Sequence, residues 1–76
     1  MKIEYSQDAD ALYITLKEND IVESDEVTDD IIMDYDENGN VVGIEILWVS
    51  EKADISQLLI RSFDKEIVTI ESVKVA

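Results

Sequence analysis

The chain has 76 residues, enough for one small domain and too few for several. It contains no Cys and no His, which excludes zinc sites, thiolate nucleophiles and imidazole bases. Nineteen acidic residues against six basic ones give a net charge of −13, which repels nucleic-acid phosphates. We therefore expect one acidic domain over residues 1–76, with no catalytic residue, no cofactor and no direct contact to nucleic acid.

The hydropathy of the chain indicates a folded protein that lies outside the membrane. Hydrophobic residues make up 46% of the chain, an ordinary fraction for a globular domain. No apolar run approaches the roughly 20 residues that span a bilayer. The first residues also lack the basic and apolar regions of a secretory signal. We expect a cytoplasmic protein with no membrane partner.

The first 27 residues predict a hairpin followed by an exposed strand. Residues 2–5 and 12–16 alternate apolar and polar side chains on either side of the turn-forming residues 6–10. Residues 18–20 predict a second turn. Residues 21–27 are more polar, as is typical of a strand at the edge of a sheet.

A second hairpin is predicted between residues 31–36 and 41–49, which are both rich in β-branched and apolar side chains. Asn38-Gly39 between them favours a two-residue type I′ turn, in which both residues have positive φ. Such a turn pairs residues whose numbers add up to 77, and this register gathers apolar side chains on one face. The expected partners are Tyr35 with Val42, Met33 with Ile44, and Ile31 with Ile46.

The C-terminal third predicts a helix and a last strand. Asp54 to Gln57 resembles a capping box, in which the side chains at both ends of the first turn bind backbone amides. Ile55, Leu58, Leu59 and Phe63 follow at helical spacing. Residues 67–75 are rich in Val and Ile. The expected fold is α+β: an antiparallel β-meander of about four strands, one short helix packed on one face against Trp48, and a C-terminal strand.

One segment matches the pattern of a calcium-binding loop. Asp34, Asp36, Asn38, Gly39 and Glu45 have the spacing at which oxygen ligands surround calcium in EF-hands. EF-hand loops are flanked by helices, whereas both flanks here predict strands. A structural hairpin explains the same residues, and calcium binding is the alternative hypothesis.

The acidic surface is the main functional candidate. Residues 1–50 contain fourteen acids and two bases. We expect a non-enzymatic module that binds, and so neutralises, a basic protein partner through carboxylates. The candidate residues are Asp25, Glu26, Asp29, Asp30, Asp34 and Asp36. An acidic surface that serves solubility alone explains the same charges.

Association with a second copy is also expected, because a core this small gives limited stability. The sequence favours a homodimer in which residues 67–75 pair with the partner, with Trp48 and Phe63 at the apolar contact.

Two blocks of the chain resemble the prokaryotic domain-of-unknown-function family 2283. The first block is Asp8-Ala9-Asp10-Ala11-Leu12-Tyr13-Ile14, and the second runs from Asp34-Tyr35-Asp36 through Gly43-Ile44-Glu45-Ile46 to Ser50. The resemblance covers residues 1–50 and departs from the family at Ser6 and at Trp48-Val49. It implies a small cytoplasmic β-meander followed by a helix, with no catalytic residue or cofactor. In the second block, Gly43 predicts a close approach, for example by an aromatic side chain of a neighbouring strand.

Overall fold

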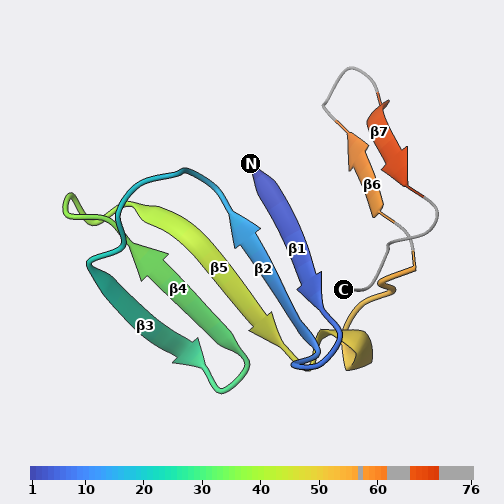
Figure 1. The fold of residues 1–76 in the computed structure, drawn as a ribbon, viewed down its shortest axis with the longest axis horizontal. Helices are drawn as coiled ribbons and strands as arrows, with labels where there is room; N and C mark the ends of the chain where they lie inside the picture. Colours follow the sequence, from blue (N-terminus) through green and yellow to red (C-terminus); the bar gives the residue numbers. More distant parts are fainter. Residues whose placement is uncertain (57, 62–65, 71–76) are drawn as a thin grey trace.

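The computed structural model describes residues 1–56, 58–61 and 66–70, with side chains described for residues 1–56. Five strands form one antiparallel sheet in the order β1-β2-β5-β4-β3 (Figure 1). Their bounds are β1 (Lys2–Ser6), β2 (Ala11–Thr15), β3 (Glu23–Thr28), β4 (Ile31–Tyr35) and β5 (Val41–Leu47). A one-turn 3₁₀ helix, Val49–Glu51, follows β5, and β6 (Leu58–Arg61) pairs with β7 (Glu66–Ile70) in a separate hairpin. Within these ranges, no helix has the length and hydropathy to cross a membrane.

The predicted meander is wrong, because β2 pairs with β5 instead of β3. Residues 16–22 carry the chain from the middle of the sheet to its far edge. Read from β5 backwards, the four strands β5, β4, β3 and β2 form a Greek key. The amide of Leu16 donates to the carbonyl of Val42 at 2.8 Å, and that of Val22 donates to the carbonyl of Tyr35 at 2.9 Å. These bonds tie both ends of the crossover to the sheet.

The prediction of an exposed strand at a sheet edge is confirmed by β3. Every residue of Glu23–Thr28 is exposed, and its one neighbour is β4. The strand carries three carboxylates in six residues, so its side chains favour water on both faces of the sheet. The more apolar β5 lies between two other strands, where its Ile side chains find apolar neighbours on both sides.

The register gathers apolar side chains in two rows that cross β1, β2, β5 and β4. The first row is Ile3, Ile14, Ile44 and Met33. The second row is Tyr5, Leu12, Ile46 and Ile31. We call these eight residues the apolar face. The predicted partners Met33 with Ile44 and Ile31 with Ile46 are confirmed.

The predicted turn and the pair next to it are wrong. Tyr35 pairs with Val41 instead of Val42, after a shift of register between Asp34 and Tyr35. Gly39 has a φ of 81°, but Asn38 is not among the described residues with positive φ, so the turn is not type I′. The carboxylate of Asp36 accepts the amides of Asn38 and Asn40, and this side-chain turn adds the residues that shift the register.

The α+β prediction is also wrong, because the described chain contains seven strands and one 3₁₀ turn in place of the packed helix. At the predicted capping box, Asp54 accepts the amide and hydroxyl of Ser56 in a local turn. Leu58–Arg61 then forms β6, because the β-branched β7 supplies backbone hydrogen bonds along its length. A short apolar run fits a helix or a strand equally well by spacing.

The predicted C-terminal strand is present in part, as β7 over Glu66–Ile70. It pairs with β6, and Figure 1 shows this hairpin apart from the five-stranded sheet. Residues 71–75 and Phe63, which the sequence placed at the dimer contact, lie outside the described residues. Trp48 is 50% exposed, and the ammonium group of Lys52 lies 5.8 Å from its ring centroid.

Asp10 joins the first turn to the 3₁₀ helix at one end of the sheet. Its carboxylate accepts the hydroxyl of Tyr5 at 2.8 Å and the hydroxyl and amide of Ser50 at 2.7 and 3.1 Å. Hydrogen bonds from Ser50 and then Tyr5 hold the pKa of Asp10 below its usual value. The backbone of Asp10 has a φ of 48°, a strained conformation that these bonds help to maintain.

The expected close approach at Gly43 is confirmed. Tyr13 on β2 reaches over Gly43 on β5, and its hydroxyl donates to the carboxylate of Asp34 on β4 at 2.5 Å. A Cβ atom at position 43 would overlap the Tyr13 hydroxyl. The missing side chain of Gly43 therefore makes room for a hydrogen bond that spans three strands.

We predict that Gly43→Ala lowers the free energy of unfolding by about 1–3 kcal/mol, because the new methyl group displaces the Tyr13 ring. In a Tyr13→Leu background, the same substitution should be less destabilising, since the hydroxyl that it would strike is absent. Urea denaturation of the four proteins measures both effects. Equal losses in the two backgrounds would show that the Tyr13 contact is not the cause.

Candidate functional site

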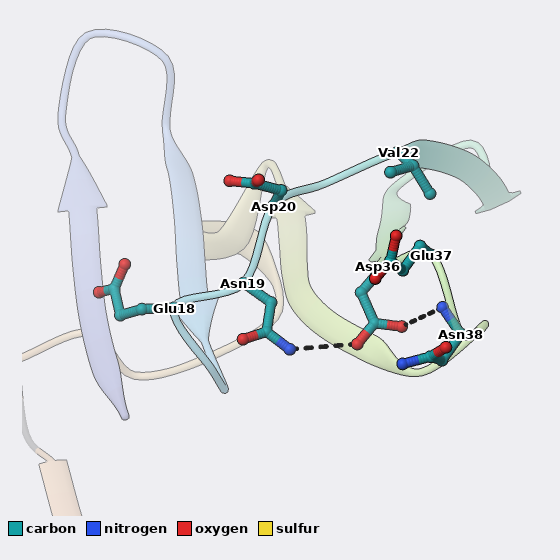
Figure 2. A pocket seen from close by; sticks show the side chains of 7 residues that line it. All are labelled: Glu18, Asn19, Asp20, Val22, Asp36, Glu37 and Asn38. Atoms are coloured by element: carbon teal, nitrogen blue, oxygen red, sulfur yellow. Dashed lines mark hydrogen bonds between the residues drawn. The ribbon is translucent and has the colours of Figure 1, made fainter.

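The crossover and the β4–β5 turn together enclose an open pocket of about 440 Å³ (Figure 2). The crossover brings residues 18–22 beside residues 36–38, although the two segments are far apart in the sequence. The lining residues are Glu18, Asn19, Asp20, Val22, Asp36, Glu37 and Asn38. Four of the seven carry a carboxylate and two carry an amide, so we call this site the acidic pocket.

Asp36 is the buried carboxylate of the acidic pocket, with 6% of its surface exposed. One oxygen accepts the backbone amides of Asn38 and Asn40 at 2.9 and 3.0 Å, and the other accepts the side-chain amide of Asn19 at 3.2 Å. These bonds, above all the one from the backbone of Asn40, lower the pKa of Asp36. Asp36 thus joins the crossover to the turn and holds the pocket in shape.

Asp34 is a second buried carboxylate, on the face of the sheet opposite the apolar face. Its two oxygens accept the hydroxyls of Tyr13 and Ser24, each at 2.5 Å. The hydrogen bond to Asp34, with burial and the negative charge of Asp34, raises the pKa of Tyr13 to about 12. Tyr13 therefore stays protonated at neutral pH and remains a donor. The network joins β2, β3 and β4.

The structure places the six predicted partner-binding residues in three different environments. Asp25, Glu26 and Asp29 are exposed on β3 or just after it. Asp30 forms an ion pair with Lys52 at 3.1 Å. Asp34 and Asp36 are buried, and their oxygens accept hydrogen bonds within the protein. Three of the six predicted residues therefore lie on or just after the edge strand β3, and two are structural carboxylates within the sheet.

Sequence reasoning missed the surface carboxylates beside this edge. Glu18 and Asp20 lie on the crossover, Glu37 lies in the turn, and Glu23 begins β3. Asn19 was interpreted only as part of a turn, yet its side chain binds Asp36. No local signal identifies these residues, because their proximity depends on the pairing of β2 with β5.

The residues of the calcium pattern lie in a hairpin. Both oxygens of Asp34 and of Asp36 accept hydrogen bonds within the protein. Glu45 lies within β5, where it pairs with Tyr13 on one side and Ile32 on the other. Over residues 1–56, 58–61 and 66–70, no group of three or more acidic side chains is placed to hold a metal ion.

The chemistry offered by this region is electrostatic. The carboxylates of Glu18, Asp20 and Glu37 are exposed around the acidic pocket, and those of β3 continue along the sheet edge. Such a surface attracts ammonium or guanidinium groups and increases their association rate.

We predict that Asp36→Asn lowers the melting temperature at pH 7, because the amide keeps the shape of Asp36 but loses its charge-assisted hydrogen bonds. The folded pKa lies below the ordinary value of about 3.9, so the stabilisation is present above that pH and is lost as pH falls through the folded pKa. In thermal melts, the difference in melting temperature between the wild type and Asp36→Asn should therefore become smaller as pH falls from 5 to 2. Glu37→Gln, at an exposed neighbouring position, is the control. A difference in melting temperature between the wild type and Asp36→Asn that does not change with pH would contradict the prediction.

Comparisons with known proteins identify a family without an assigned function. No curated protein and no solved structure matches the chain. The family described as "Protein of unknown function (DUF2283)" matches residues 2–50, which include all five strands of the sheet and end at Ser50, the partner of Asp10. This match covers more than half of the chain, and the protein therefore belongs to the DUF2283 family.

Proposed function

We propose that this domain is a non-enzymatic protein-binding module that binds a basic, extended segment of a partner protein. The segment would lie along β3 and the turn after it, where four carboxylates form what we call the acidic edge. These are Glu23, Asp25, Glu26 and Asp29. The exposed position of β3 at the end of the sheet is the observation that supports this proposal most directly.

An edge strand offers backbone groups as well as charge. β3 has a neighbour on one side, so the amides and carbonyls that point away from β4 are available to an added strand. Strand addition at a sheet edge is a general mode of peptide recognition, in which backbone hydrogen bonds give affinity and side chains give specificity. Opposite charges on facing strands add about 0.2–1 kcal/mol per pair.

The acidic edge continues into the acidic pocket. Val22 lines the pocket, and the next residue, Glu23, begins β3. A basic segment bound along β3 would thus bring one end to the pocket, where a Lys or Arg side chain meets the carboxylates of Glu18, Asp20 and Glu37. Asp36 supports this arrangement by fixing the turn to the crossover.

The charge of the acidic edge also selects among partners. Carboxylates on an edge strand oppose pairing with another acidic strand, including β3 of a second copy. They therefore favour a basic strand over self-association at this edge. An edge that is charged only to prevent aggregation would carry the same carboxylates. Binding of a basic peptide at β3 distinguishes a partner-binding edge from an edge that only prevents aggregation.

A non-enzymatic role is supported by the state of the buried carboxylates. Asp34 accepts two hydroxyls and Asp36 accepts three N–H groups, so these bases are engaged in holding strands and loops together. The hydroxyl of Tyr13 has a raised pKa, which opposes its use as a nucleophile at neutral pH.

We predict that a peptide of eight Lys residues, which presents Lys to Glu23 and Asp25 on one face of β3 and to Glu26 on the other, binds the domain. Its affinity should fall as salt rises, because exposed ion pairs are screened. Replacing Glu23, Asp25 and Glu26 by their amides should raise the dissociation constant about tenfold. Three exposed ion pairs together contribute roughly 1–2 kcal/mol to the binding free energy, and that contribution is lost. Isothermal titration calorimetry measures both effects.

A matched variant separates local binding from attraction to net charge. Replacing Glu4, Asp8 and Glu51 by their amides removes the same three charges from exposed sites off the acidic edge. This control should bind the peptide nearly as well as the wild type. Equal weakening by the two triple variants, or no binding by the wild type, would refute the proposal.

Calcium binding at Asp34, Asp36, Asn38 and Glu45 is the alternative, and it also has a direct test. Because the oxygens of Asp34 and Asp36 already accept internal hydrogen bonds, a bound ion would have to displace those donors. We predict that millimolar calcium and magnesium change the melting temperature equally, through general screening of the −13 charge. A rise specific to calcium, at fixed ionic strength, would favour the alternative.

A further inference from the structure

The apolar face has no second layer over it among the described residues. The five strands lie side by side in one layer in Figure 1. None of the eight residues of the apolar face is buried, and Ile3 is 37% exposed. The buried apolar side chains within residues 1–56 are Ala11, Val42 and Val49. A sheet needs a packed layer on its apolar face to gain a core, so a covering layer is required.

The exposed area of the chain is larger than that of a compact monomer. The accessible surface is 5844 Å², about 1,100 Å² more than the roughly 4,700 Å² expected for a compact monomer of 8.6 kDa. A stable protein–protein interface buries about 800 Å² on each partner. The excess is shared between the uncovered sheet and the separate β6–β7 hairpin, and the sheet's part of it is area that a covering layer removes.

The placement of charge favours a second copy of this chain as the covering layer. The apolar face carries no charged residue, although the chain has a net charge of −13. Three carboxylates lie on the opposite face: Glu4, Glu45 and Glu26. Glu4 and Glu45 each stand between two residues of the apolar rows along their strands, and Glu26 pairs with Ile32, which stands between Ile31 and Met33. A basic partner is attracted to those carboxylates and to the acidic edge. Two acidic copies meet with least repulsion at their uncharged faces.

We propose that two copies pack through their apolar faces to form a homodimeric β-sandwich. Two twisted sheets packed face to face lie about 10 Å apart, with the inward side chains of both sheets interdigitating. The contact is the same patch on both copies, as twofold symmetry requires. β3, with its polar Asp25 and Thr28 beside the apolar rows, lies at the border of the contact and keeps its outer edge free.

Sedimentation equilibrium of the full chain tests this proposal. The wild type should have twice the mass of 8.6 kDa at micromolar concentrations, and its melting temperature should rise with protein concentration. Met33→Gln places a polar side chain of similar length in the contact and should raise the dissociation constant at least about tenfold. Ile3→Gln does the same on the edge strand β1, where the fold tolerates change best.

Neighbouring residues on the opposite face provide matched controls. Ile32→Gln on β4 and Glu4→Gln on β1 should leave the dissociation constant within about threefold of the wild type, about 0.7 kcal/mol. Far-UV circular dichroism verifies that each variant is folded. If Met33→Gln does not fold, the dissociation constants of Ile3→Gln and of the wild type decide whether the apolar face is the dimer contact. A wild type that is monomeric at 1 mM would refute the proposal and indicate coverage by its own C-terminal residues. A dimer that is insensitive to Met33→Gln and Ile3→Gln would also refute it.

Discussion

The missing side chain of Gly43 is the constraint on which the arrangement of the sheet depends. Because β5 has no Cβ at this position, the Tyr13 ring crosses over it and reaches the Asp34 carboxylate. Ser24 binds the other oxygen of Asp34, so one network spans β2, β5, β4 and β3. A buried carboxylate is strongly destabilising without partners. The pairing of β2 with β5, which makes the Greek key, brings one of these partners into place.

The Greek key also gives the two sides of the molecule different properties. It sends the chain across the sheet end, which creates the acidic pocket, and it leaves the acidic β3 at an edge. The same register collects Ile14, Ile44, Ile46 and Ile31 on the opposite side from the buried carboxylate. Charge and apolar surface are therefore separated in space. The acidic edge borders the apolar face at Asp25, which pairs with Met33, so the two proposed contact surfaces are neighbours that share no residue.

Local patterns in the sequence predicted those features that depend on neighbours along the chain. Alternation identified the first hairpin and the exposed β3, and the apolar pairs fixed the register of Ile31 and Met33. The position of Gly43 indicated a close aromatic contact. These features follow from the two-residue period of strands, which any strand pairing must respect.

The features that were missed depend on contacts between distant segments. Alternation says which face a residue occupies but not which strand lies beside it, so β2 could have paired with β3 or β5. The crossover and the acidic pocket follow from that choice and were not predictable without it. The prediction of a helix over residues 54–63 is wrong for a different reason. Four apolar positions in two turns do not distinguish a helix from β6, whose partner β7 lies further along the chain.

The bond between Asp10 and Ser50 has a consequence for how the chain can vary. Ser50 closes the sheet against its own first turn, and every strand-to-strand pair of the five-stranded sheet lies before this residue. Among the described residues, no strand pair of that sheet and no ion pair involves a residue beyond Lys52. This position is thus a natural junction for fusion, where evolution or an engineer can exchange the appended segment without redesigning the sheet.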